Sequence, residues 1–70
     1  MSMKDYPPLL TPLEAMEMTG LDRHIIQRWR KRGNVTTVQI NGRTFLERES
    51  VLKAVARRER ALYEKRQLNV

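Results

Sequence analysis

Residues 22–33 read DRHIIQRWRKRG, and this stretch decides the fold because it predicts a helix with two different faces over residues 23–32. Asp22 precedes the helix as an N-cap whose carboxylate can accept hydrogen bonds from the free amide groups of the first turn. Gly33 follows it and allows the left-handed backbone at which helices commonly end. Apolar residues at three- and four-residue spacing predict one buried face. These residues are Ile25, Ile26 and Trp29.

The opposite face of this predicted helix is basic and polar. Its candidate binding residues are Arg23, His24, Gln27, Arg28, Arg30, Lys31 and Arg32. Glutamine can form two hydrogen bonds with adenine and arginine two with guanine, so Arg23, Gln27 and Arg28 are interpreted as readers of base edges in duplex DNA. The three basic residues at the end of the helix are interpreted as phosphate contacts. A solvated basic helix face is the alternative explanation of the charge.

A shorter helix is predicted upstream, over residues 12–19. Thr11 is its N-cap, Pro12 occupies the first helical position, and Glu14 stands where a capping box requires an acidic or amide side chain. Gly20 supplies the chain reversal between the two helices. The residues of the short helix expected to face the core are Leu13, Ala15, Met16 and Met18.

Downstream of the basic helix the pattern changes from helical to extended. Residues 35–40 are rich in β-branched side chains, Asn41 and Gly42 form a strong two-residue turn signal, and residues 43–46 return as a second strand. The sequence therefore predicts a two-stranded antiparallel hairpin. Asn41, Gly42 and Arg43 at its tip are candidate DNA contacts, because arginine suits the narrow, negative minor groove. A tight turn followed by a solvated arginine is the alternative.

A third helix is expected from about Arg48 onward, and dense charge follows Ala56. Its expected apolar anchors are Val51, Leu52, Val55 and Leu62. The later basic residues are interpreted as a solvated face interleaved with glutamates, with a second anion contact as the alternative. These basic residues are Arg57, Arg58, Arg60, Lys65 and Arg66. Because the Pro7-Pro8 pair disfavours a helix, we expect a flexible N-terminal arm over 1–9. We expect the folded domain over 10–56 and a charged helical extension over 57–70.

Composition excludes several classes of function. The chain has 70 residues, a formal net charge of +6, no cysteine and one histidine, so we expect neither a disulfide framework nor a metal site, and no cofactor. No residue pattern supplies a nucleophile and a base together, so an enzyme is not expected. No apolar run is long enough for a membrane span, which predicts a soluble cytoplasmic protein. Residues 21–33 hold five basic residues against one acidic residue, which indicates an oriented contact with a polyanion.

The order helix, helix, hairpin, helix predicts a small α+β fold of the winged helix-turn-helix type. In this arrangement the first helix braces the second, whose N-terminal side chains reach base edges in the major groove. The alternative is a pair of helices in an unrelated helical domain. Trp29 could stack on a base, but its spacing predicts packing in the core.

Four stretches together resemble the excisionase and MerR-like winged helix-turn-helix family. They are Leu10 to Ala15, Thr19 to Asp22, Ile26 to Gly33, and Asn41 to Phe45, within a region that covers residues 9–55. The resemblance implies a recognition helix in the major groove, carried by Arg23, His24, Gln27 and Arg28, and a wing at Asn41 to Arg43. The chain departs from the family in lacking a proline after Gly33 and the effector-binding region and long coiled coil of the MerR sensors.

The resemblance implies a protein that binds double-stranded DNA in a bacterial or phage-infected cell and associates with the nucleoid when bound. The preferred hypothesis is an excisionase-like recombination directionality factor that bends DNA near an attachment site, with an integrase as partner and cooperative self-association on DNA. A small phage-type transcriptional regulator that uses the same surface is the first alternative. A protein-interaction adaptor, in which the basic helix binds an acidic partner, is the alternative of another class.

Overall fold

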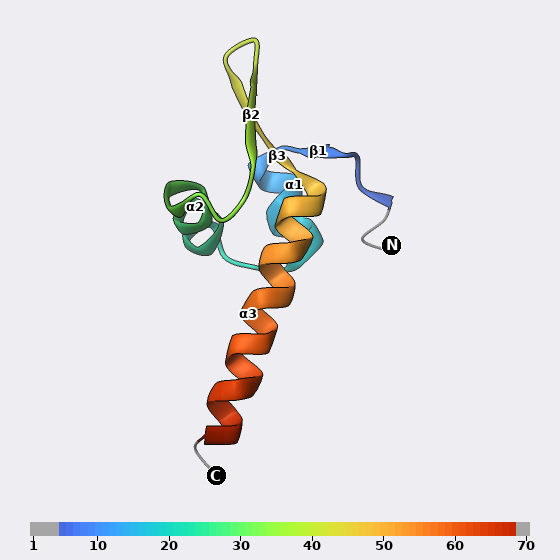
Figure 1. The fold of residues 1–70 in the computed structure, drawn as a ribbon. Coiled ribbons are helices and arrows are strands. Elements are labelled where there is room, and N and C mark those ends of the chain that lie inside the picture. Colours follow the sequence, from blue (N-terminus) through green and yellow to red (C-terminus); the bar gives the residue numbers. More distant parts are fainter. Residues whose placement is uncertain (1–4, 69–70) are drawn as a thin grey trace.

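The protein forms a small α+β fold with three helices and a three-stranded antiparallel sheet in the part of the chain that its structure, a computed structural model, describes. That part is residues 5–68, with side chains through residue 65. The elements follow one another as β1 (Leu9–Leu10), α1 (Pro12–Thr19), α2 (Arg23–Arg32), β2 (Thr37–Ile40), β3 (Arg43–Glu47) and α3 (Arg48–Leu68). In Figure 1 the hairpin of β2 and β3 and the outer half of α3 extend from the body in opposite directions.

Helix α1 begins and ends where its capping residues predict. The amide of Glu14 donates to the Thr11 hydroxyl at 3.1 Å, and the amide of Thr11 donates to the Glu14 carboxylate at 2.9 Å, so both halves of the capping box are formed. At the other end Gly20 adopts a φ of 69° and its amide donates to the carbonyl of Met16. This sharp end positions α2 beside α1.

Helix α2 also confirms its predicted bounds. The Asp22 carboxylate accepts a hydrogen bond of 3.1 Å from the amide of His24 at the first turn. Gly33 ends the helix with a φ of 72°, and its amide donates to the carbonyls of Arg30 and Trp29. The three basic residues of the last turn lie at the negative end of the helix dipole, which stabilises this terminus.

The hairpin has the turn that Asn41 and Gly42 predict. Both residues have positive φ, 49° and 78°, which matches the right-handed twist of the flanking strands. Ile40 pairs with Arg43 directly beside the turn, and Gln39 pairs with Thr44 one position further in. Because side chains alternate along a strand, the Gln39 and Thr44 side chains lie on one face of the hairpin and those of Ile40 and Arg43 on the other.

A third strand, β1, corrects two predictions about the N-terminal region. The sequence predicted a two-stranded hairpin and a flexible arm over 1–9, of which residues 1–4 lie outside the described part. Leu9 and Leu10 instead pair with Glu47 and Leu46 of β3. The carbonyl of Pro8 accepts a hydrogen bond of 2.8 Å from the amide of Arg48. The two prolines oppose a helix, but they are compatible with the start of an edge strand, which needs few amide donors.

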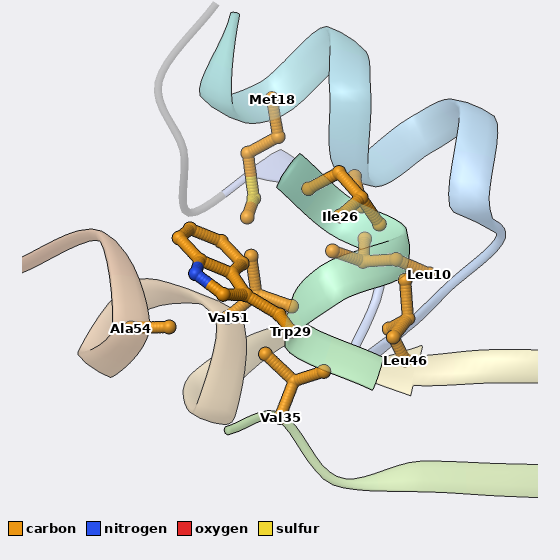
Figure 2. Close-up of a cluster of buried hydrophobic side chains, with 9 residues drawn as sticks. Leu10, Met18, Ile26, Trp29, Val35, Leu46, Val51 and Ala54 are labelled. Carbon is orange, nitrogen blue, oxygen red and sulfur yellow. The ribbon is translucent and has the colours of Figure 1, made fainter. Parts of the chain in front are cut away.

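The core lies between the sheet and the three helices (Figure 2). Its buried residues are Leu10, Ala15, Met18, Ile26, Trp29, Val35, Leu46, Val51 and Ala54. Trp29 is buried as predicted, with its ring beside Met18, Val51 and Ala54 in Figure 2. The prediction of a buried side chain is wrong for two residues: Leu13 is 63% exposed and Leu62 is 48% exposed. Leu13 is therefore on the solvent-exposed side of α1, and Leu62 lies within residues 56–65 of α3, which are exposed throughout.

Candidate nucleic-acid interface

Helix α2 presents its predicted binding residues to solvent. Six of these seven side chains are exposed, and Arg30 is half-buried. The exposed residues are Arg23, His24, Gln27, Arg28, Lys31 and Arg32. The same helix buries Ile26 and Trp29, which fixes its rotation about its own axis. The packing of one face therefore holds the other face, with its basic and amide groups, outward.

A hollow of about 500 Å³ separates α2 from the hairpin. We call it the α2–hairpin hollow, and its lining residues are Gln27, Arg30, Lys31, Thr37, Gln39 and Thr44. The Gln39 side chain donates a hydrogen bond of 2.7 Å from its Nε2 atom to the Thr44 hydroxyl, across the two strands. Basic and amide groups from the helix thus face hydroxyl and amide groups from the hairpin across one open groove.

Gln27 lies at the centre of the exposed face of α2. Besides the α2–hairpin hollow, it lines a second hollow of about 390 Å³ between α1 and α2, together with Leu13 and Arg23. It also lines a shallow hollow of about 300 Å³ along the outer side of α2, together with Arg28 and Lys31. A ligand that covers α2 from any of these sides contacts Gln27. Arg30, shared by the first two hollows, lies beside it.

The described charged side chains that line the three hollows around α2 are all basic. Within the described part of the chain, none of these three hollows has an acidic lining residue. The nearest acidic group in sequence, Asp22, accepts a hydrogen bond from the backbone at the start of the helix. The guanidinium and ammonium groups of α2 therefore repel one another, and binding of an anion relieves this repulsion.

The tip of the hairpin stands apart from the α2–hairpin hollow. Asn41, Gly42 and Arg43 are all exposed, at the end of a hairpin that projects from the body (Figure 1). The strand register places Arg43 on the hairpin face opposite the one that carries Gln39 and Thr44. The structure therefore brings the α2 residues together with the base of the hairpin but does not bring Arg43 into the same hollow.

Three residues of the α2–hairpin hollow were not among the predicted site residues. They are Thr37, Gln39 and Thr44. Two of them follow from the turn at Asn41 and Gly42, because a two-residue turn sets Gln39 opposite Thr44 and places both on one face. The signal was present in the sequence, but the side of the hairpin that faces α2 is set by the packing of the sheet.

Residues 5–68 contain no group of three or more His, Cys, Asp or Glu side chains arranged to hold a metal ion. His24 is exposed on α2. No helix within residues 5–68 combines the length and the apolar character needed to cross a bilayer.

Comparison with known proteins adds no relative. No family model, curated protein or solved structure matches the chain.

Proposed function

We propose that the protein binds duplex DNA in a sequence-specific manner as a winged helix-turn-helix. In this proposal α1 braces α2, α2 enters the major groove, and the hairpin of β2 and β3 is the wing. The observation that carries the proposal is the exposed face of α2, whose basic and amide side chains continue into the α2–hairpin hollow, where none of the described lining residues is acidic. A major groove about 12 Å wide admits an α-helix.

The positions on α2 support a division of labour between base and phosphate contacts. Gln27 is central, and its amide can donate to and accept from the edge of adenine. Arg23 and Arg28 lie one helical turn before it and directly after it, and each can donate two hydrogen bonds to guanine. Lys31 and Arg32, at the end of the helix, are assigned to phosphates, and Arg30 to the groove wall beside the hairpin.

The proposal is tested by selecting bound sequences from random duplex DNA and measuring the affinity for the best sequence as a function of salt. If about five to six phosphates are contacted, the slope of log K against log salt is close to −5. A selection that enriches no motif, or the absence of duplex binding at low salt, overturns the proposal. An acidic protein partner would then be the better explanation of the basic helix.

Two double variants with the same loss of charge separate a specific surface from general attraction. Arg23→Ala with Arg28→Ala alters the exposed face of α2, whereas Arg60→Ala with Lys65→Ala alters exposed residues of α3. Both remove two positive charges. We expect the first pair to abolish the preference for the selected sequence and the second pair to retain it. Equal effects of the two pairs would contradict base reading by α2.

The use of this binding is proposed from the resemblance to excisionases. We infer an accessory role in site-specific recombination, in which the protein bends DNA at an attachment site and shifts an integrase toward excision. An assay of excision and integration with the integrase tests this role, and an unchanged ratio of products on addition of the protein overturns it. A transcriptional regulator would bind DNA through the same surface without altering that ratio.

A further inference from the structure

A second basic hollow lies on the other side of α2, between its C-terminal end and α3. It has a volume of about 350 Å³, and we call it the α2–α3 hollow. Its polar lining residues are Arg32, Asn34, Arg57 and Arg58. Trp29, 8% exposed, and Ala54, 4% exposed, line it as well and belong to the core, so the floor of the hollow is formed by core residues.

Three guanidinium groups meet at this hollow without an acidic lining residue among the described residues. The Nη2 atom of Arg57 donates a hydrogen bond of 3.1 Å to the carbonyl oxygen of Asn34, which holds this side chain against the loop that follows α2. Arg32 and Arg58 approach from α2 and α3, respectively. Like charges that converge in this way repel one another, so an anion bound between them is favoured.

The α2–α3 hollow continues the basic surface of α2. Arg32 lines both this hollow and the shallow hollow along the outer side of α2, where Gln27 and Lys31 lie. In Figure 1 the hairpin extends from the level of α2 in one direction and the outer half of α3 in the other. A DNA duplex that contacts α2 and the hairpin on one flank can therefore meet Arg57 and Arg58 on the opposite flank.

We propose that the α2–α3 hollow binds a backbone phosphate of the duplex, on the flank of the site opposite the one contacted by the hairpin. This inference rests on the proposed DNA-binding function and extends its footprint. Guanidinium groups suit phosphate oxygens because their planar array of N–H donors can bind two oxygens at once. The aromatic residue of the hollow, Trp29, is almost entirely buried, and the one exposed apolar residue among the described lining, Ala61, is small, so the lining offers no exposed aromatic side chain of the kind that anchors protein partners.

Arg58→Ala is the informative variant, and Arg60→Ala is its matched control. Both residues are exposed on α3 and both changes remove one positive charge, but Arg60 does not line the hollow. Each protein is titrated with three duplexes: the minimal selected sequence, and that sequence lengthened by about half a helical turn on one flank or on the other. Arg57→Ala is a second variant, whose folding is checked by circular dichroism because it loses the bond to Asn34.

For wild-type protein we expect one lengthened duplex to bind more tightly than the minimal one, and the other not. Arg58→Ala removes this gain, weakens binding to that duplex roughly tenfold at low salt and lowers the salt slope by about 1. Arg60→Ala leaves the gain intact. The proposal is overturned if Arg58→Ala and Arg60→Ala behave alike, or if Arg58→Ala weakens binding to all three duplexes equally.

Two further outcomes separate a failure of the proposed DNA binding from a failure of the proposed phosphate site. If wild-type protein binds none of the duplexes, the proposed DNA-binding function itself fails. If Arg58→Ala leaves DNA binding unchanged but weakens binding of a poly-glutamate peptide, the hollow recognises an acidic protein segment, and the phosphate proposal is wrong while DNA binding stands.

Discussion

The guanidinium of Arg48 donates a hydrogen bond from its Nη1 atom to the main-chain carbonyl oxygen of Tyr6. Arg48 is also the first residue of α3, and its amide donates to the carbonyl of Pro8. One residue therefore attaches the segment before β1 to the junction of β3 and α3. Tyr6 in turn packs against the core. The N-terminal segment is thus part of the folded domain from this point onward.

Replacing Arg48 by methionine should lower the free energy of unfolding by about 1–2 kcal/mol. Methionine keeps most of the aliphatic stem but leaves the part-buried Tyr6 carbonyl without this donor. Denaturant unfolding followed by circular dichroism measures the change. Arg60→Met, on an exposed position of α3, is the control, and a loss no larger than its own would show that the Arg48 contact does not stabilise the fold.

Truncation of Leu46 and of Leu62 should change the free energy of unfolding by very different amounts. Leu46→Ala removes a fully buried side chain from the centre of the core and should destabilise the protein by about 2–5 kcal/mol. Leu62→Ala, at a position 48% exposed, should change stability by less than about 0.5 kcal/mol. Thermal or denaturant unfolding of both variants tests this. A large effect at Leu62 would indicate that α3 is covered by another molecule in solution.

Gln27→Ala and Lys31→Ala should weaken DNA binding by different routes. Loss of the central amide at Gln27 should cost about 1–3 kcal/mol on the selected sequence and relax the preference for it, because the contact reads a base. Loss of the Lys31 ammonium should weaken the selected and random sequences alike. Affinities on both duplexes at one salt concentration make the comparison. If both variants lower the affinity for the selected duplex, relative to the random duplex, by the same factor, the assignment of Gln27 to a base and Lys31 to a phosphate is wrong.

Gly33→Ala tests how the end of α2 is fixed. An added Cβ atom would meet no heavy atom within 4 Å, so the cost comes from the backbone φ of 72° and not from a clash. We expect a loss of about 1–2 kcal/mol in the free energy of unfolding. Gly33→Asn should lose less, because asparagine tolerates the left-handed region better. Equal stability of glycine and alanine at this position would mean that the helix end rearranges.

Local signals predicted the helices and the turn well. These signals act through hydrogen bonds or φ angles within a few residues, so the local sequence is enough to predict their effect. They are Thr11 with Glu14, Asp22, and the pair Asn41-Gly42. Strand β1 could not be predicted in this way. Two leucines carry no periodicity, and the partner strand lies far along the chain.

The candidate site divides along the same line. The exposed face of α2 was predictable because Ile26 and Trp29 had to be buried, which turns the other face outward. Leu13 was misplaced because the side of α1 that meets the sheet depends on where β3 lies. The meeting of Arg32 with Arg57 and Arg58 depends on how α2 and α3 pack around Trp29, so no spacing in the sequence indicates it.

The pairing of β1 with β3 also limits the order in which the elements can fold during synthesis. During synthesis Leu10 emerges early, but its strand partner Leu46 becomes available only when two helices and most of the hairpin have emerged. Until then Leu9 and Leu10 have no strand to pair with, and one side of the core is missing. The sheet can therefore be completed only after β3 has left the ribosome, and β1 is among the last elements to reach its final position.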